Sequence, residues 1–178
     1  MAQAILAQGV LAFVSAHTLR DMGGALGSVL LRWKGVEYGA DGEVRRCLFC
    51  DFANERPAEN GELKPLLHKD HVCAVFASRA QDASTHLLVV PRQHVQNCLQ
   101  PETAELLPHF LRVADELAPG ATLCFHRPPF NSIDHLHMHV LVKPYRNVFK
   151  RLKHEPATWK VWTKDARKLL LEQPVGCA

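Results

Sequence analysis

Histidines occupy three alternate positions of the run HLHMHVLV: His135, His137 and His139. Alternation of polar and apolar residues predicts a half-buried strand, and side chains two residues apart on a strand share one face. The apolar residues between the histidines would then enter a core on the other face. Buried imidazoles need hydrogen-bond partners, so three on one face indicate an organised polar site.

Length and composition place the chain among ordinary globular proteins. Its 178 residues fit one domain, with 47% hydrophobic and 22% charged residues. A net charge of +3 is too small to argue for nucleic-acid binding, and no apolar run approaches the roughly 20 residues of a membrane span. The six cysteines do not form the pattern of a secreted disulfide framework. We therefore expect reduced thiols and a cytoplasmic protein, with the nucleus or an organelle also open.

The first 44 residues differ from the rest of the chain. The stretch AILAQGVLAFVSAHTLRDMGG is apolar and almost free of acids. It lacks the basic start of a signal peptide and the arginine density of a transit peptide, although a targeting role stays open. We expect residues 1–44 to be an extension, helical in part, and residues 45–178 to be the folded domain.

Several further segments carry clear secondary-structure signals. Strands are expected at 71–78, 85–92, 121–127 and in the histidine run, and helices at 101–120 and 158–173. Pro108 is expected to distort the first half of the longer helix. Strands with one main helix, not strictly alternating, predict an α+β domain built on an antiparallel sheet.

The histidine pattern, followed by apolar residues, resembles the signature of the histidine triad family. The strand THLLVVPRQH and the segment FHRPPFNSIDHLHMHVL strengthen the likeness, which runs from about Cys47 to Lys143. These segments are similar to the adenosine monophosphoramidase branch, especially the third type of histidine triad nucleotide-binding protein. The resemblance implies an antiparallel sheet with one long helix and a C-terminal helix.

The same resemblance implies a hydrolase that cleaves adenosine 5′-monophosphoramidates, AMP joined to an amine or a lysine, to AMP. His137 would attack the α-phosphorus and form a nucleotidyl-histidine, as an imidazole unprotonated near neutral pH can do. His139 would hydrogen-bond toward the phosphate or the leaving group, and His86 would lie behind it or serve only as a core histidine. No catalytic cofactor is expected.

Nucleotide contacts also follow from the resemblance. The candidates near the phosphate, each of which could equally have an ordinary loop role, are Ser132, Asn131 and His126. Apolar candidates around the purine, which could equally be plain core residues, are Leu48, Phe49, Phe52 and Phe76. The family usually carries an acid for the ribose where this chain has Ser78, and Asp82 is an alternative ribose ligand.

Cys47 and Cys50 have the spacing of metal ligands, but one such pair can also be redox-active or accidental. Triad proteins that bind structural zinc add the histidine after the VVP strand and the first triad histidine. Those residues are His94 and His135 here, which would close a tetrahedral site. The alternative is two buried thiols beside two hydrogen-bonded histidines.

Two other functions and one assembly stay open at this level. An aprataxin-like enzyme would remove AMP from adenylated nucleic acid ends, using a basic segment with Lys143, Arg146, Lys150, Arg151 and Lys153. No zinc finger follows that segment, and a nucleotide-binding adaptor with incidental activity is a third reading. The apolar stripe Leu106, Leu107, Phe110, Leu111 and Val113 is wide for one monomer, so we expect a two-fold homodimer.

Overall fold

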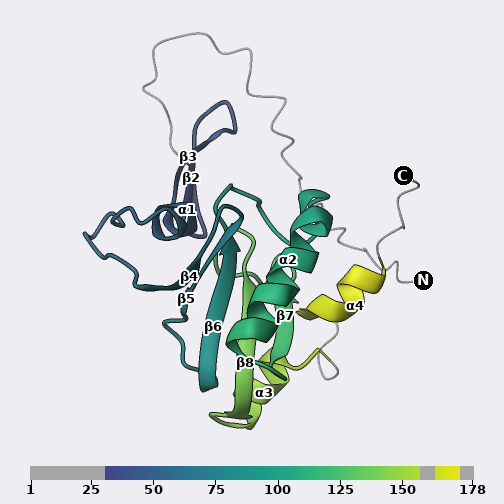
Figure 1. Cartoon of the computed structure of the whole chain (residues 1–178). Helices are drawn as coiled ribbons and strands as arrows, with labels where there is room; N and C mark the ends of the chain where they lie inside the picture. The colour runs from purple at the N-terminus through teal and green to yellow at the C-terminus, as the bar shows by residue number, and fades with distance from the viewer. Residues whose placement is uncertain (1–30, 157–162, 173–178) are drawn as a thin grey trace, which may run out of the picture.

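A six-stranded antiparallel sheet forms the centre of the fold, within the residues that the computed structural model describes, 31–156 and 163–172 (Figure 1). The strand order is β4-β5-β6-β8-β7-β9. The strands are β4 (Leu66–Lys69), β5 (Cys73–Ala77), β6 (Ala83–Pro91), β7 (Thr122–His126), β8 (Met138–Tyr145) and β9 (Thr163–Asp165). The predicted α+β class and antiparallel sheet are therefore confirmed.

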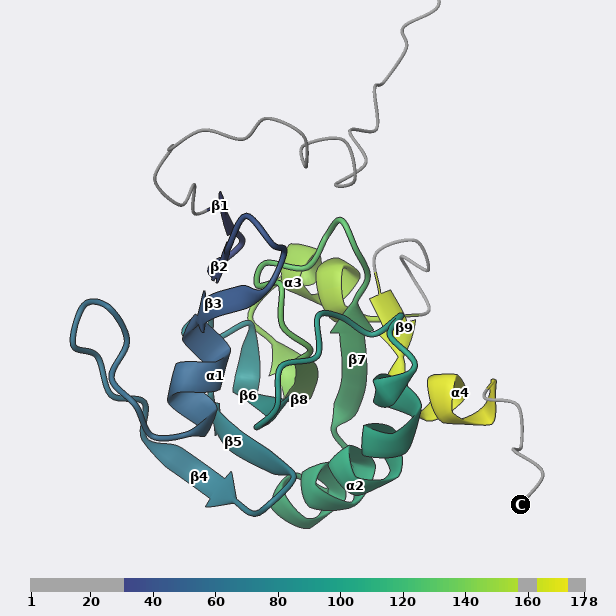
Figure 2. The same ribbon diagram turned by 90° about the horizontal axis from the view of Figure 1, so that it is seen from above.

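The sheet has two buried faces with different chemistry, because strand residues alternate between them. On β6, Leu87 and Val89 pack into a core that also contains helix α2 (Glu102–Leu117). His86 and Leu88 alternate with them and face the other side, where helix α1 (Leu48–Ala53) lies. Figure 2 shows α1 and α2 on separate parts of the sheet, seen from above.

Helix α2 continues through Pro108, so the expected distortion does not divide it. Its apolar stripe is buried against the sheet of the same chain: Leu107, Phe110, Leu111 and Val113 belong to the core, and Leu106 packs against it. Burial of this stripe therefore requires no partner subunit, and the homodimer stays a prediction. The breadth of the stripe comes from the curved sheet that it covers, together with helix α4 (Ala166–Leu171).

Asp70 ties together three elements on this side of the sheet. One carboxylate oxygen accepts the backbone N–H groups of Val72 and Cys73, both at 2.8 Å. The other oxygen lies 2.9 Å from Nε2 of His68 on β4 and 2.7 Å from Nε2 of His109 on α2. Burial opposes ionisation, but these hydrogen bonds hold the pKa of Asp70 below its usual range.

A small second sheet precedes α1, with strands β1 (Leu31–Trp33), β2 (Val36–Tyr38) and β3 (Val44–Cys47) in that order. Residues 31–44 of the expected extension are thus strands and turns. The helix expected in the apolar stretch before residue 25 lies outside the described residues. Lys34 and Gly35 form the β1–β2 turn with positive φ angles of 46° and 74°.

The histidine run joins the sheet later than the alternation predicted, because β8 begins at Met138. Before that point β6 reaches Pro91, which has no N–H for the ladder, and Leu136 donates instead to the carbonyl of Val95 at 2.6 Å. The face prediction is confirmed nevertheless: Leu136, Met138 and Val140 all enter the core that contains α2.

Two helices follow the histidine strand. Helix α3 (Val148–His154) was not expected, and Asn147 caps it by accepting from the N–H of Lys150 at 3.0 Å. Helix α4 confirms the second half of the C-terminal helix expected at 158–173; β9 occupies residues 163–165 of that span, and residues 158–162 lie outside the described residues. Among the helices of the described ranges, none has the length and apolar character needed to cross a membrane.

Candidate functional site

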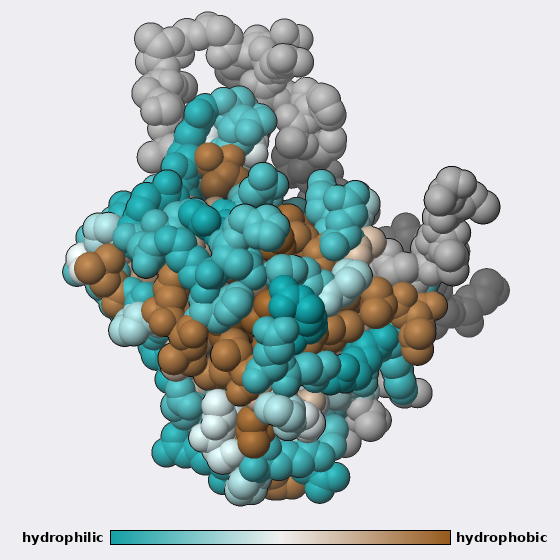
Figure 3. All heavy atoms as spheres, in the orientation of Figure 1, coloured by the Kyte–Doolittle hydropathy of each residue, from teal (hydrophilic) through white to brown (hydrophobic). Residues whose placement is uncertain are grey.

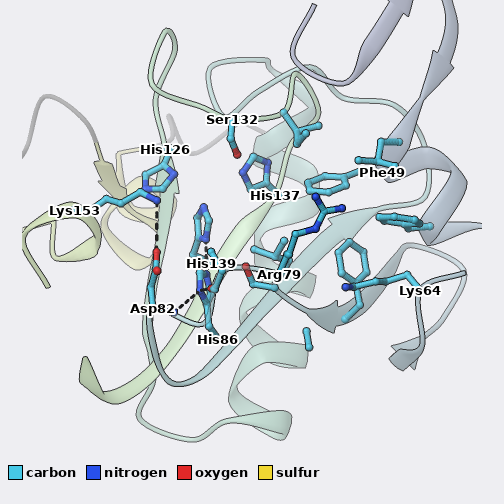
Figure 4. Close-up of a pocket in the computed structure, with 18 of the residues that line it drawn as sticks. Phe49, Lys64, Arg79, Asp82, His86, His126, Ser132, His137, His139 and Lys153 are labelled. Carbon is cyan, nitrogen blue, oxygen red and sulfur yellow. Dashed lines mark hydrogen bonds and ion pairs between the residues drawn. The ribbon is translucent and has the colours of Figure 1, made fainter. Parts of the chain in front are cut away.

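A cavity of about 250 Å³ opens on the sheet face opposite α2 (Figure 4). One end is apolar, and all four candidates for purine contact line it: Leu48, Phe49, Phe52 and Phe76. The rings of Phe49 and Phe76 meet edge to face with centroids 5.6 Å apart. Phe52 meets Phe76 in the same way at 5.8 Å. Such a wall suits a flat aromatic ligand.

A continuous series of rings leads from this apolar end to a polar one. Phe49 contacts His137 with centroids 5.3 Å apart, and His137 is 5.0 Å from His139. His139 is 4.4 Å from His126, which stacks on His154 at 5.0 Å. The cavity therefore changes along its length from phenylalanines to clustered imidazoles, and His137 stands at the boundary.

The backbone determines which nitrogen of His137 faces the cavity with a lone pair. Nδ1 lies 2.7 Å from the carbonyl oxygen of His135, which can only accept, so Nδ1 carries the proton. Nε2 has no partner among the described residues. Burial lowers the pKa of His137 to about 4, although the bond to the carbonyl opposes this shift. The imidazole is therefore neutral near pH 7 and offers a free lone pair.

His139 is oriented by a chain of two hydrogen bonds. Nδ1 of His86 donates to the carbonyl oxygen of Ala80, so Nε2 of neutral His86 must accept. It accepts from Nδ1 of His139 at 2.8 Å, which leaves Nε2 of His139 toward the cavity. Burial lowers the pKa of both histidines, so both are neutral at neutral pH. His86 thus acts on His139 through a buried contact, as one of the two sequence readings expected.

The polar end contains residues that sequence reasoning did not assign to this role. His154 of α3 is fully buried, and its Nε2 lies 2.8 Å from Oδ2 of Asp82. Asp82 also pairs with Lys150 at 2.9 Å and Lys153 at 3.5 Å. Burial raises the pKa of Asp82, but hydrogen bonds from His154 and Lys150 outweigh it and hold the pKa below its usual range.

The remaining candidates divide into two groups. Ser132, His126 and Ser78 line the cavity. Asn131 does not: its side chain accepts from Nζ of Lys34 at 2.9 Å and donates to the carbonyl of Ile133 at 3.1 Å, which holds the loop before the triad. Asp82 also lines the cavity, yet its carboxylate oxygens are engaged by α3.

The β1–β3 hairpins support that loop from the outside. Asp134 accepts from the hydroxyl of Tyr38 at 2.6 Å and from the amide of Gln96 at 2.8 Å. Its backbone N–H donates to the carbonyl of Lys34 at 3.0 Å. A Cβ on Gly35 would lie 2.8 Å from Cδ1 of Ile133, so the turn touches the loop directly. These contacts position Ser132 and the first triad histidine.

A second cluster lies behind the cavity and brings together all four predicted zinc ligands: Cys47, Cys50, His94 and His135. Nδ1 of His135 is 3.3 Å from Sγ of Cys47 and 3.4 Å from Sγ of Cys50, and Nδ1 of His94 is 3.6 Å from Sγ of Cys50. Zinc bonds of about 2.3 Å to sulfur and 2.05 Å to nitrogen at tetrahedral angles place such atoms about 3.6 Å apart. The donor set therefore fits the ion.

Two further features agree with a metal at this cluster. Nε2 of His135 lies 3.2 Å from the carbonyl oxygen of Pro91, which directs Nδ1 toward the cysteines. The pKa of Cys47 is lowered chiefly by the hydrogen bond from the Cys50 thiol, with His135 and His94 contributing. A thiolate is the form of cysteine that binds metals.

Four of the five basic residues after the triad share two carboxylates, those of Asp82 and Glu155. Lys150 and Lys153 pair with Asp82, as above. Arg151 lies 2.6 Å and Lys143 3.6 Å from the carboxylate of Glu155. Of the five basic residues proposed to meet a phosphate backbone, only Arg146 has no ion pair among those that the described residues form.

Comparisons with known proteins agree with this geometry. Residues 46–154 match the family model described as "Scavenger mRNA decapping enzyme C-term binding". The chain is 35% identical over 124 residues to the bifunctional adenosine 5′-phosphosulfate phosphorylase/adenylylsulfatase HINT4 of Arabidopsis thaliana, covering 64% of this chain and 82% of the relative. It is 35% identical over 105 residues to adenosine 5′-monophosphoramidase HINT3 of Xenopus tropicalis, covering 53% and 66%.

The solved structures give the same fold at lower identity. A HIT family hydrolase from Clostridium thermocellum superposes with a TM-score of 0.50 and 18% identity, covering 59% of this chain and 96% of the other. At that identity the likeness supports the arrangement of strands and helices alone.

Proposed function

This chain belongs to the histidine triad family, and from that membership we propose that it hydrolyses adenosine 5′-monophosphoramidates to AMP. One observation carries the proposal. The free Nε2 lone pair of His137 stands where the phenylalanine end of the cavity meets the imidazole end. A nucleotide with its purine among the phenylalanines would bring its α-phosphorus to this nitrogen.

The proposed reaction has two steps. Nε2 of His137 attacks the α-phosphorus, the P–N bond to the leaving amine breaks with its electron pair on nitrogen, the amine takes up a proton from solvent, and a nucleotidyl-histidine forms. Water then attacks the same phosphorus as the P–N bond to His137 breaks, which gives AMP, free His137 and a proton to solvent. His135 favours the attack, because its carbonyl oxygen keeps the proton of His137 on Nδ1. Because the histidine itself forms the covalent bond, the proposal includes no catalytic metal or other cofactor.

Charge that develops on the phosphate needs donors directed at it. Ser132 lines the cavity beside His137 and can donate its hydroxyl proton (Figure 4). Nε2 of His126 has no hydrogen-bond partner among the described residues, so it can carry a proton and donate. We assign these two residues to the phosphate, and Ser78 at the edge of the apolar end to the ribose.

We propose that the cluster of Cys47, Cys50, His94 and His135 holds structural zinc. All four positions are taken by protein ligands, so no position is left for substrate. The ion would join α1, β3 and the triad loop, because its ligands come from each of these segments. Its role would be to stabilise the loop on which the nucleophile depends.

A nucleic acid end as substrate is the second candidate, and the structure gives it less support. A phosphate backbone would compete for these cations with two carboxylates, because Lys150 and Lys153 pair with Asp82 while Arg151 and Lys143 pair with Glu155. A pure binding role as an adaptor is disfavoured, because four imidazole nitrogens of the cavity, on His126, His137, His139 and His154, are buried without partners among the described residues, which is costly unless they serve a reaction.

A homodimer also remains part of the proposal, on different grounds from the helix stripe. Strand β4 is an edge strand of the large sheet and carries Leu67, which is 57% exposed. Hydrophobic side chains cross the middle of the face seen in Figure 3. An unpaired edge with an apolar side chain favours pairing with a second copy.

The cysteines in the described part of the chain are free thiols, which fits the proposal of a reducing compartment.

A single-turnover experiment with AMP-tryptamine labelled in the phosphate tests the function. The native protein should carry acid-labile AMP at early times and release free AMP later. His137→Ala should form no adduct and lose more than about nine-tenths of kcat, equivalent to roughly 1.4 kcal/mol of barrier. His71→Ala, which changes an exposed histidine away from the cavity, is the matched control and should behave as native. An adduct on the Ala variant would exclude His137 as the nucleophile.

A further inference from the structure

Three buried imidazoles from three different elements come together at the polar end of the cavity. His126 of β7, His139 of β8 and His154 of α3 each place one ring nitrogen within 4.8 Å of the other two. We infer that they form a second metal site, which takes a divalent cation of the zinc, nickel or copper kind, and that the bound ion blocks turnover. The block rests on the proposed function, whereas the metal site does not.

The hydrogen bonds behind two of these rings leave lone pairs at the cluster. Nδ1 of His139 donates to His86, so Nε2 of His139 carries a lone pair. Nε2 of His154 lies 2.8 Å from the carboxylate of Asp82, which only accepts, so Nδ1 of the neutral ring carries a lone pair as well. Nε2 of His126 carries one when the proton of that ring is on Nδ1. All three nitrogens are buried without a hydrogen-bond partner among the described residues.

The spacing of the rings suits a shared ion. The ring centroids of His126 and His139 are 4.4 Å apart, and that of His154 is 5.0 Å from each. In the cysteine-containing cluster, whose donor distances fit zinc, the centroids of His94 and His135 are also 5.0 Å apart. Zinc bonds of about 2.05 Å at tetrahedral angles place nitrogen atoms about 3.3 Å apart, so small rotations of the three rings would complete the set.

The surroundings prepare two of the rings as ligands. The pair of Asp82 and His154 is the carboxylate–histidine arrangement that typically supports a metal ligand from behind, and His86 supports His139 in a similar way. Burial lowers the pKa of His126 to about 3 and that of His154 to about 4, and it lowers the pKa of His139 as well. The three imidazoles are therefore neutral at neutral pH, and an ion need not displace a proton from them.

Two lysines determine which cations can enter. Lys150 and Lys153 lie 2.9 Å and 3.5 Å from the two oxygens of Asp82, so the surroundings oppose any cation and leave no free carboxylate oxygen for Mg²⁺ or Ca²⁺. An ion must gain strong bonds to imidazole nitrogen, as zinc, nickel and copper do. Figure 4 shows Lys153 beside His126, and its side chain is 44% exposed, so it can turn to water as an ion enters.

A histidine cluster on the α2 side of the sheet does not offer the same donors. His68 and His109 both direct Nε2 at the carboxylate of Asp70. Burial raises the pKa of the neighbouring Cys73 thiol to about 12, so it is not a thiolate at neutral pH. These side chains satisfy one another, whereas the nitrogens at the cavity have no such partners.

A filled site would obstruct the reaction at His137. Phe49 marks the purine end of the cavity and His137 the attacking nitrogen, so the leaving amine must pass the side of His139 and His126. An ion on Nε2 of His139 would occupy that space, because the rings of His137 and His139 are only 5.0 Å apart. Coordination would also take away the donor that His126 directs at the phosphate.

Equilibrium dialysis against Zn²⁺ tests the metal site without turnover. The native protein should hold about one more zinc per chain than His154→Gln, because glutamine keeps a donor for Asp82 but has no imidazole nitrogen. His71→Gln changes an exposed histidine and should match the native protein. Melting temperatures check the folding of each variant. Equal zinc contents in native and folded His154→Gln protein overturn the inference.

Inhibition of AMP-tryptamine turnover gives the second readout. Zn²⁺ should abolish native turnover and Mg²⁺ should not, and His154→Gln should need more than about tenfold more zinc for half-inhibition. Lys153→Gln should need less zinc than the native protein, because it removes an opposing charge, and this variant decides the question if His154→Gln does not fold. If the native protein does not turn over AMP-tryptamine, the proposed function fails and dialysis alone decides the metal site. Turnover that zinc inhibits equally in native and variant proteins, or not at all, overturns the inference and leaves the function standing.

Discussion

His86 offers the sharpest test of how the triad is positioned. The substitution His86→Phe keeps an aromatic ring in a position that is only 1% exposed, but it removes both hydrogen bonds of the chain from Ala80 to His139. The Nδ1–H of His139 would then be buried without a partner, whereas the carbonyl of the exposed residue Ala80 keeps the N–H of Asp82 at 3.0 Å. One such buried group costs about 1–3 kcal/mol, so we expect a loss of about 1–3 kcal/mol of unfolding free energy.

The effect on activity should be separable from the effect on stability. Without His86 the His139 ring can hold its proton on either nitrogen and can rotate, so we expect kcat/KM on AMP-tryptamine to fall about 10- to 100-fold, or roughly 1.4–2.7 kcal/mol. His86→Gln is the rescue variant, because a side-chain amide has one donor and one acceptor and can serve both partners. It should recover most of the activity and stability.

The native, His86→Phe, His86→Gln and His71→Gln proteins should be compared by chemical denaturation and by steady-state kinetics. At about 2–4 °C per kcal/mol for a chain of this length, the Phe variant should melt roughly 2–12 °C lower. His71→Gln alters an exposed histidine and should match the native protein in both measurements. Equal kcat/KM in native and Phe proteins would refute the view that His86 positions His139, and leave it as a core histidine.

Three further outcomes are expected. Metal analysis of protein prepared without chelators should find about one zinc per chain, and Cys47→Ser with Cys50→Ser should remove it and lower the melting temperature; native protein free of zinc would contradict this. Ser78→Asp should lower KM for the ribonucleotide with little change in kcat, because a carboxylate binds ribose hydroxyls more strongly than a serine; an unchanged KM would show that Ser78 is not beside the ribose. Asp70→Asn should lower the free energy of unfolding by about 1–3 kcal/mol at pH 7. Because the pKa of Asp70 is depressed in the folded protein, the carboxylate contributes its full stability above its unfolded pKa near 3.9, and this contribution fades as pH falls below that value. Urea titrations should therefore show the unfolding free energies of the variant and the native protein converging in acid.

The parts of the fold that could be predicted are those with a strong local pattern. Short apolar segments identified β5, β6 and β7, and the span from Pro101 to Gly120 identified α2. The start of β8 could not be predicted, because it depends on where β6 ends and on the bond from Leu136 to Val95. Helix α3 has seven residues, too few for a clear helical period, and four of them are basic.

The candidate site shows the same division. The four candidate zinc ligands and the four candidate purine contacts come together as the spacing and the family resemblance indicated. The pairing of Asp82 with His154 joins residues 72 positions apart that share no motif. Nothing in the sequence indicated that the apolar stripe of α2 would be covered by its own sheet, since burial of a helix face depends on the tertiary partner.

The turn at Lys34 and Gly35 connects the N-terminal part of the chain to the chemistry. It contacts the loop of Asn131, Ile133 and Asp134 through a lysine, a close packing contact and a backbone hydrogen bond. A molecule that binds this hairpin in only one arrangement of the loop must change nucleotide affinity, and the nucleotide must change the affinity of that molecule by the same factor. A ligand bound at this hairpin can thus change nucleotide binding at the triad without entering the cavity.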